Sequence, residues 1–523
     1  MNTTTRAGRR EWIGLAVLAL PTLLLALDFS VLYLALPFLG ADLQASGVQL
    51  LWISDIYGFL VAGFLVTMGT LGDRIGRRRL LLTGAAAFAA LSVVAAYSTS
   101  AEMLIVARAL LGIVGATIMP STLALISNMF RDARQRATAI SLWATCLLGG
   151  VAIGPVVGGV LLGSFWWGSA FLIGVPVMLV LLVAGPVLLP EYRSPGGGRL
   201  DPVSVGLSLA AILPFIYGLK ELAKGDAGTS ALAGLVVGAV AGVAFVRRQR
   251  RLPTPLLDLR LFADRSFGAA LGILLLGAMI SGGIGFLFTQ YLQLVEGLSP
   301  LAAGLWLLPY IASMIAGSLL CPLVARRVRP GYVIAGGLGI SAIGFLLLTQ
   351  VPAVGGLPLS VAGLVVVFFG IAPTWVLGTD LVVGTAPPER AGSASALSET
   401  SSEFGVAFGV AVLGTIGTAV YRLSVAGDLP AGAFPPGTVD AAEDSLVSAT
   451  AVAAQLPEPL GGTLLGTARE AFTSGFNVAA AVGVPAAIGL AVLAVVLLRH
   501  VRPAGAAAEH RDPDPDTVPA PSA

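Results

Sequence analysis

Long apolar runs recur along the whole of this sequence, and they restrict the folds that the chain can adopt. A hydrocarbon core of about 30 Å is crossed by about 20 helical residues, so an apolar run of about 18 or more residues is a candidate membrane helix. We count fourteen such runs, at residues 13–38, 50–70, 80–98, 103–125, 138–163, 167–189, 202–220, 229–246, 267–292, 300–323, 331–349, 357–380, 391–420 and 476–498. Because 56% of the residues are hydrophobic and only 11% are charged, we predict an all-α integral membrane protein with about 14 transmembrane helices.

The basic residues separate into two sets that predict how the chain is oriented. Short cytoplasmic loops collect lysine and arginine. With the N-terminus inside, 25 of the 30 basic residues fall in inner segments and Arg108 falls within a span. The four on the outer side are Lys220, Lys224, Arg422 and Arg469. We therefore predict a multi-pass protein of the cell (cytoplasmic) membrane with both termini cytoplasmic. The first span is too long for a cleaved signal peptide and is expected to be retained.

Cysteine and histidine are too few, and too poorly placed, to suggest a metal or thiol site. Cys146 and Cys321 fall in different spans without metal-like spacing. His500 and His510 lie in or beside the C-terminal tail, which leaves carboxylates as the expected carriers of any proton traffic.

Two arginine-rich loops indicate an internal repeat. GTLGDRIGRRR (69–79) follows the second span and PLVARRVRPG (322–331) follows the tenth, so spans one to six align with spans nine to fourteen. Spans seven and eight become two inserted helices. The predicted organisation is a cytoplasmic N-terminus (1–11), a six-helix half (12–190), the two inserted helices (200–247), a cytoplasmic linker (248–266), a second six-helix half (267–498) and a disordered cytoplasmic tail (499–523).

One long outer segment, residues 421–475, interrupts the second half. It is acidic, and DAAEDSLVSATAVAAQL within it has an apolar face at helical spacing. We expect one or two short helices at the membrane surface or a hairpin, with a solvated loop as the alternative.

Five motifs together carry a family resemblance. They are LDFSVLYLALP with Asp28, LWISDIYGF (51–59) with Asp55, GTLGDRIGRRR, ARALLGIVGATIMPSTL (107–123) with Arg108, and GVAIGPVVGG (150–159). The chain resembles the major facilitator superfamily, and within it the fourteen-span drug:proton antiporters, from about residue 12 to about residue 498. The resemblance implies a major facilitator fold of two six-helix halves plus two inserted helices. It also implies proton-coupled efflux of drugs.

The inner-loop motif is predicted to act as a conformational latch. Its residues are Gly69, Asp73, Arg74, Gly76 and Arg77. Glycines permit close backbone approach, and the charged side chains can pair with neighbouring helix ends, so such a cluster can hold one conformation and release it in the other. The alternative is that the arginines only set the topology.

The fifth-span motif combines a kink with a flat helix face. Pro155 removes a backbone hydrogen bond, while the glycines allow another helix to approach closely. The glycines are Gly150, Gly154, Gly158 and Gly159. Plain packing explains this pattern by itself, and the resemblance adds a second role in closing the transport path against leak.

Charged residues within the spans are the candidate coupling and substrate groups. They are Asp28, Asp55, Arg108, Glu399 and Glu403. Ions inside a membrane are costly and usually mark transport paths. Glu399 and Glu403 are four residues apart and share a helical face. The alternatives are a hydrogen-bonded structural acid at Asp28, a snorkelling or paired arginine at Arg108, and a partly wet segment around the two glutamates.

The excess of carboxylates over arginine predicts a cation as substrate. The pKa of a carboxyl group depends on burial and on neighbouring charges, so alternating exposure can load and release a proton. If proton and cation need the same carboxylate, exchange follows from competition. The chain carries Met314 where one exporter of this family has an acidic residue used with divalent cations, so we expect monovalent cations to be preferred.

The sequence thus predicts a proton-coupled multidrug efflux antiporter and no enzyme. Its partners would be small lipophilic or cationic substrates, protons and the lipid bilayer, with no nucleic acid, no metal and no cofactor other than the proton motive force. No Walker-type nucleotide loop is present. The alternatives are a dedicated exporter of a single natural product and a receptor or scaffold without transport activity.

Overall fold

The structure is a computed structural model that describes most of the chain. The described residues are 7–130, 132–191, 193, 201–223, 228–252, 255, 259–385, 391–429, 434–435 and 437–501. The predicted tail beyond residue 501 lies outside them, as do residues 1–6 of the predicted N-terminal segment and part of the predicted linker 248–266.

Helices make up all the regular structure of the described residues, which contain no strand. The first group comprises α1 (Arg9–Asp42), α2 (Gly47–Ile75), α3 (Arg77–Ala96), α4 (Ala101–Gly115), α5 (Ile118–Met129), α6 (Ala133–Ser164), α7 (Ser169–Leu172) and α8 (Gly174–Leu188). Two helices follow, α9 (Pro202–Ala223) and α10 (Thr229–Gln249). The second group comprises the 3-10 helix η1 (Leu259–Ala263), α11 (Arg265–Gln290), the π-helix η2 (Tyr291–Val295), α12 (Pro300–Ala325), α13 (Pro330–Leu348), α14 (Leu357–Thr385), α15 (Ala391–Asp428), α16 (Thr438–Asp444), α17 (Leu446–Ala453) and α18 (Leu460–Leu498).

The predicted membrane spans correspond to these helices. Thirteen stretches are long and apolar enough to cross a membrane, with α4 and α5 forming one stretch and α7 and α8 another. The remaining predicted span, 202–220, is α9, whose apolar part is the shorter stretch Pro202–Gly218. The prediction of an all-helical, multi-pass membrane fold is confirmed.

Local sequence explains where many of these helices begin. Side chains that accept a hydrogen bond from a backbone N–H of the first turn stand directly before six of the described helices, one of them Ser445 before α17. The other five N-cap residues are Ser46, Ser100, Asp132, Asp264 and Ser299, before α2, α4, α6, α11 and α12 respectively.

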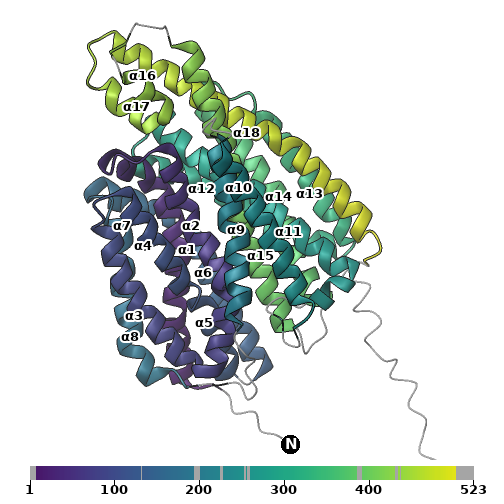
Figure 1. Cartoon of the computed structure of the whole chain (residues 1–523). Coiled ribbons are helices and arrows are strands. Elements are labelled where there is room, and N and C mark those ends of the chain that lie inside the picture. The colour runs from purple at the N-terminus through teal and green to yellow at the C-terminus, as the bar shows by residue number, and fades with distance from the viewer. Residues whose placement is uncertain are drawn as a thin grey trace, which may run out of the picture.

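The two groups of helices stand side by side, with α9 and α10 at the line between them (Figure 1). Within the first group α1 packs on α6, α2 on α4 and α3 on α8; within the second, α11 packs on α15 and α13 on both α14 and α18. We call the end at which α1 begins and α2 ends the arginine-rich end. The opposite end, which carries α16 and α17, is called the capped end.

The inserted helix α9 covers the contact between α2 of the first group and α15 of the second. Buried apolar side chains from all three helices form one small cluster there, centred on Phe59, Ile216, Ala407 and Ala411. Gly58 of α2 faces the side chain of Ala407, so the two helices lie close together at this level. The inserted pair is therefore attached to both groups.

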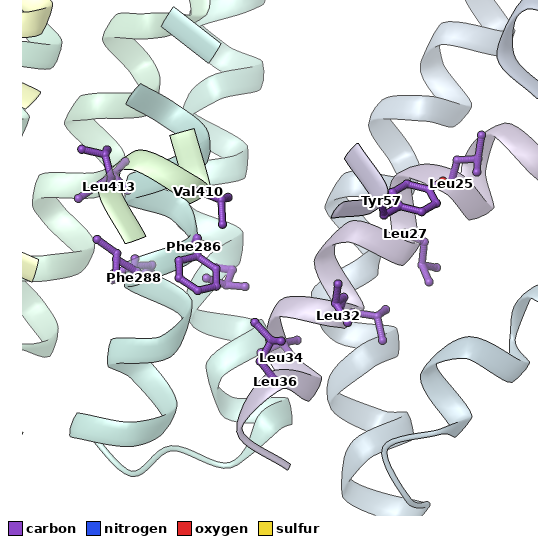
Figure 2. Packing of buried hydrophobic residues seen from close by; sticks show 14 of the residues in the cluster. Leu25, Leu27, Leu32, Leu34, Leu36, Tyr57, Phe286, Phe288, Val410 and Leu413 are labelled. Atoms are coloured by element: carbon purple, nitrogen blue, oxygen red, sulfur yellow. The ribbon is translucent and has the colours of Figure 1, made fainter. Parts of the chain in front are cut away.

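The contacts of α1 with α11 and of α6 with α12 lie toward the capped end. The rings of Tyr33 and Phe286 meet edge to face at 5.5 Å between centroids, and the side-chain amide of Gln290 donates to the Tyr33 carbonyl at 2.9 Å. Figure 2 shows Leu34 and Leu36 of α1 near Phe286, whereas the helices diverge toward Leu25. The two groups are thus joined on the capped side of the membrane-spanning region.

The segment between the last two long helices is shorter than the predicted outer segment, 421–475. α15 continues to Asp428 and α18 begins at Leu460, so much of the segment extends the neighbouring spans. Two short helices, α16 and α17, lie in the described part of the remainder. The Tyr421 hydroxyl donates to the Ala442 carbonyl at 2.7 Å, which fastens α16 to α15. The apolar face at helical spacing predicted this pair but not the extension of the flanking helices.

Candidate functional site

A buried ion pair joins α1 and α4 in the interior of the first group. Asp28 lies past the middle of α1, and Arg108 lies about two turns into α4. Nη1 of Arg108 donates to Oδ2 of Asp28 at 2.8 Å, and the two residues are 0% and 8% exposed respectively. The two intramembrane charges that the sequence singled out in the first and fourth spans therefore neutralise one another.

The guanidinium of Arg108 is held by α2 as well. Its Nε donates to the carbonyl of Ile53 at 3.3 Å, and its carbon lies 4.4 Å from the centre of the Tyr57 ring. A cation over an aromatic face is attracted by the ring quadrupole, and the attraction is larger when both are desolvated. Arg108 thus links α1, α2 and α4 through one side chain.

Asp55 lies on α2 between these two contacts in the sequence, and it is 1% exposed. Tyr33 of α1 is close enough to both Asp55 and Arg108 for their charges to act on it. The same tyrosine is within reach of charge on Tyr310 of α12 and Glu403 of α15. Tyr33 therefore lies within electrostatic reach of titratable groups from both helix groups.

Glu399 and Glu403 lie one turn apart on α15, and both are half-buried. Glu403 is near enough to Tyr57 for its charge to act on that ring hydroxyl. Within the described part of the chain, no salt bridge joins either glutamate to a basic side chain. The structure therefore brings Glu403 toward the Asp28 and Arg108 pair without giving it a cation of its own.

Metal ligands do not gather anywhere in the residues that the structure describes. Within these ranges no group of three or more histidine, cysteine, aspartate or glutamate side chains is arranged to hold a metal ion. Cys146 and Cys321 are both free thiols.

The predicted latch residues form the sharp turn from α2 to α3 at the arginine-rich end. Gly76 has φ +112°, a conformation that favours glycine, and a side chain added there would collide with the carboxylate of Glu191. Arg77 is buried, and its Nη1 donates to the Pro120 carbonyl at 3.3 Å. Gly69 and Arg74 lie on the last turns of α2, as does the backbone of Asp73, whose side chain lies outside the described residues.

Glu191, just after α8, is a residue of this turn that the sequence reasoning missed. Its Oε1 accepts from the backbone N–H of Arg78 at 3.2 Å. Its Oε2 lies 3.7 Å from Nε of Arg78 and 3.8 Å from Nε of Arg79. No local signal marks Glu191, because it is more than a hundred residues away in the sequence from the motif it contacts.

The glycines of the fifth-span motif face two different partners. Gly150 and Gly158 lie against Leu23 and Val31 of α1, within the first group. Gly159 lies against the backbone of Leu301 in α12, across the contact between the groups. Gly154 and Pro155 are buried in the same stretch of α6.

Gly304 of α12 completes this contact and was also missed by the sequence reasoning. A side chain added at Gly304 would collide with the carbonyl of Pro155, so the two helices touch through their backbones here. The PLAAG stretch around Gly304 gives no sign of its partner in the sequence alone.

Comparison with known proteins assigns most of the chain to the family that its sequence motifs resemble. The family profile described as "Major Facilitator Superfamily" matches residues 18–410. The chain is 47% identical to the multidrug efflux pump LfrA of Mycolicibacterium smegmatis, over 94% of this chain and 97% of that protein. It is 35% identical to the methyl viologen resistance protein SmvA of Salmonella typhimurium, over 90% and 94%.

Two further comparisons agree with this assignment. The tetracenomycin C resistance and export protein of Streptomyces glaucescens is 33% identical over 98% of this chain and 95% of its own length. Among solved structures, a bacterial homolog of the human lysosomal transporter Spinster superposes with a TM-score of 0.67 at 17% identity, covering 95% of this chain and 99% of that one, which supports the fold. With its apolar helices, its family profile and these relatives, the chain is a multi-pass membrane transporter that belongs to the major facilitator superfamily.

Proposed function

We propose that this protein is a proton-coupled antiporter that exports lipophilic, cationic compounds across the cytoplasmic membrane. The observation that carries the proposal is the Asp28 and Arg108 pair, a carboxyl group and a guanidinium in contact at 2.8 Å and buried between membrane-spanning helices. Relatives named as efflux, resistance and export proteins support transport of small molecules out of the cell. They also argue against a receptor or scaffold without transport activity.

Coupling follows from competition for Asp28. Protonation of Asp28 removes its charge and leaves the buried Arg108 without a counter-ion, which is costly in a low-dielectric interior. A substrate cation that approaches Asp28 must likewise displace the guanidinium. Proton and substrate therefore disturb the same contact, and each favours release of the other.

The second group supplies the charge that attracts the substrate. Glu399 and Glu403 have no basic partner in the described part of the chain, and Phe404, next to Glu403 on α15, packs against the ring of Phe59 of α2 with 5.9 Å between ring centroids. Carboxylates next to aromatic faces suit a lipophilic cation, which gains from both. Asp55 adds a buried carboxylate on the other side of the site.

Orientation and energy source are part of the same proposal. The arginine-rich end faces the cytoplasm with both termini, as the distribution of basic residues indicates. The proton motive force drives export, with no other cofactor. In this orientation the contacts between α1 and α11 and between α6 and α12 close the outer side, so the site opens inward and is reached from the cytoplasm or the inner leaflet.

Dye-driven proton movement in inverted membrane vesicles tests the proposal. Ethidium added to vesicles that hold a preformed pH gradient should collapse the gradient with wild-type protein and not with Asp28→Asn. Asp440→Asn, which removes an exposed carboxylate of α16, is the matched control and should behave as wild type. Failure of wild type with several cationic dyes would overturn the multidrug proposal, and full activity of Asp28→Asn would make Asp28 structural.

Preference for singly charged cations is the narrower part of the proposal. Met314, half-buried on α12, places no charge where one exporter of this family has an acidic residue. A relative named for methyl viologen, itself a dication, makes this part the easiest to overturn. The measurement is the resistance of the same cells to methyl viologen and to ethidium. Equal resistance to both would contradict a preference for singly charged cations.

Export of a single natural product is the second candidate function. It is favoured by the relative named for tetracenomycin C, which matches nearly the whole chain. A substrate-profile comparison separates the two candidates, because a dedicated exporter should protect cells from one chemical scaffold and not from unrelated cationic dyes.

A further inference from the structure

The arginine-rich end of α10 carries a groove that the transport mechanism does not use. The groove has a volume of about 730 Å³ and is open to the surroundings of the protein. Its lining residues are Ala239, Val240, Val243, Ala244, Arg247, Arg248, Arg251 and Leu252. They recur at intervals of three and four residues, so they form one face of the helix, about 20 Å long at 1.5 Å per residue.

The groove changes in character along its length. Val240 and Val243 are exposed and lie within the apolar stretch of α10 that is long enough to cross a membrane. Arg247 and Arg251 lie one and two turns further toward the arginine-rich end, where the helix leaves the apolar region. The part of the groove at Val240 and Val243 thus suits an acyl chain. The part at Arg247 and Arg251 lies at the depth of lipid head groups.

The arginines of the groove differ in how their charge is balanced. Arg248 forms two hydrogen bonds with Asp201 at the start of α9, at 2.8 and 2.9 Å, so its charge is already neutralised. In the described part of the chain no carboxylate pairs with Arg247 or Arg251, and both side chains are exposed. Two positive charges therefore remain beside an apolar surface.

The α9 and α10 pair offers a firm support for a bound molecule. Gly218, Gly234 and Gly238 let the two helices touch through their backbones. The side-chain amide of Gln249 donates to the Ser204 hydroxyl at 2.7 Å, beside the Asp201 and Arg248 pair. The face that carries Arg247 and Arg251 is thus built on a closely packed helical hairpin.

We propose that this groove binds an anionic glycerophospholipid, with its phosphodiester on Arg247 and Arg251 and an acyl chain along Val240 and Val243. Arginine binds phosphate through paired N–H groups, and basic pockets at the ends of membrane helices bind anionic lipid head groups. A zwitterionic lipid has the same phosphodiester but adds a positively charged head group, which the two arginines would repel, so an anionic lipid fits the groove better. The proposal is independent of what the protein transports.

Lipid titration of the full-length, delipidated protein by native mass spectrometry tests the proposal. Phosphatidylglycerol should bind more tightly than phosphatidylcholine to wild type. Each arginine near a membrane surface contributes about fivefold to the binding of anionic lipid, so Arg247→Gln/Arg251→Gln should weaken phosphatidylglycerol binding about twenty-five-fold. Arg247→Lys/Arg251→Lys keeps the charge and should retain most of the binding.

Arg326→Gln/Arg327→Gln is the matched control. It removes two exposed arginines from the same end of the bundle, at the end of α12, outside the groove. This variant should bind phosphatidylglycerol as wild type does, and added inorganic phosphate should not displace the lipid. If Arg247→Gln/Arg251→Gln does not fold, the single variant Arg251→Gln replaces it, with an expected loss of about fivefold.

Three results would overturn the proposal. One is unchanged phosphatidylglycerol binding after loss of Arg247 and Arg251. These arginines would then act only in setting the orientation of the chain in the membrane. Another is an equal loss in the α12 control, which would show general attraction to a basic surface. Displacement by inorganic phosphate alone would reduce the site to an anion site without a lipid.

Discussion

Two aspartate–arginine pairs in this protein have the same closest N–O distance and different surroundings. Asp28 and Arg108 meet at 2.8 Å inside the bundle, and Asp201 and Arg248 meet at 2.8 Å at the arginine-rich end of the inserted helices. The Arg108 side chain is 0% exposed, whereas that of Arg248 is 36% exposed. Each pair joins two helices, and among the described residues the first lies near the buried titratable groups Tyr57 and Asp55.

The difference between the pairs is energetic. A buried charge costs several kcal/mol to desolvate, so breaking a buried pair leaves an expensive uncompensated ion. An exposed pair is screened by water and contributes about 0–1 kcal/mol. The pair at Asp28 can therefore act as a switch, because its rupture has consequences for the whole site. The pair at Asp201 can only fasten one helix to the next.

Loss of charge at Asp28 is expected to have the largest effect. Asp28→Asn leaves Arg108 buried without a counter-ion, which should lower the free energy of unfolding by about 3–5 kcal/mol. Thermal unfolding of purified protein, followed by fluorescence, measures the change, with Asp440→Asn as the control. A melting temperature equal to that of wild type would mean that Arg108 finds another carboxylate, and Asp55 would be the first to examine.

Removal of both charges separates stability from transport. Asp28→Asn/Arg108→Gln no longer buries an unpaired ion, so it should recover most of the stability that the single variant loses. Transport should not return, because the carboxylate that proton and substrate compete for is still absent. Recovery of dye-driven proton movement in this double variant would contradict the proposed role of Asp28.

The fold could be predicted from the sequence because lipid imposes a simple rule. Every spanning helix needs about 20 apolar residues, and the runs at 13–38 and 331–349 show this directly. The rule weakens where a helix leaves the membrane. α18 begins at Leu460, well before the predicted 476, because its first turns pack against α17 and need no lipid.

The site could be predicted only in part. Asp28 and Arg108 were recognisable because a charge within an apolar run is conspicuous. Tyr33, Glu191 and Gly304 were not, since tyrosine and glycine are ordinary in membrane helices and a glutamate after a span resembles any loop residue. What makes these three distinctive is the partner each meets across the bundle, and pairing between distant segments is not readable from local pattern.

Glu403 sharpens the comparison because it is a carboxylate without a basic partner in the described ranges. Glu403→Gln should leave stability unchanged or raise it slightly, since no buried cation loses its counter-ion. Export of ethidium should fall by about tenfold, the value expected for loss of one charge interaction worth about 1.4 kcal/mol. The matched control is Glu470→Gln, an exposed position on α18. A loss of stability as large as that of Asp28→Asn would show that Glu403 is also paired.

The smallest change in stability is expected on substitution of Asp201. Its dependence on pH distinguishes it from the change at Asp28. Its hydrogen bonds with Arg248 hold the pKa of the Asp201 carboxyl well below its ordinary value of about 3.9. A carboxyl group with a lowered pKa stabilises the folded state at pH above its ordinary pKa, and this contribution is lost as the pH falls through the folded pKa. Asp201→Asn should therefore lower the melting temperature by no more than about 2 °C between pH 8 and pH 5.

The difference between wild type and Asp201→Asn should shrink only below about pH 4, where the carboxyl of the unfolded wild-type chain begins to take up protons while that of the folded chain is still ionised. Melting curves of both proteins between pH 3 and pH 8 measure it. A difference that grows as the pH falls would reverse the expected sign and mean that Asp201 is stabilised in its protonated form. A difference as large as that at Asp28 would show that lipid and neighbouring helices shield this end of the hairpin from water, so that the pair behaves as a buried one.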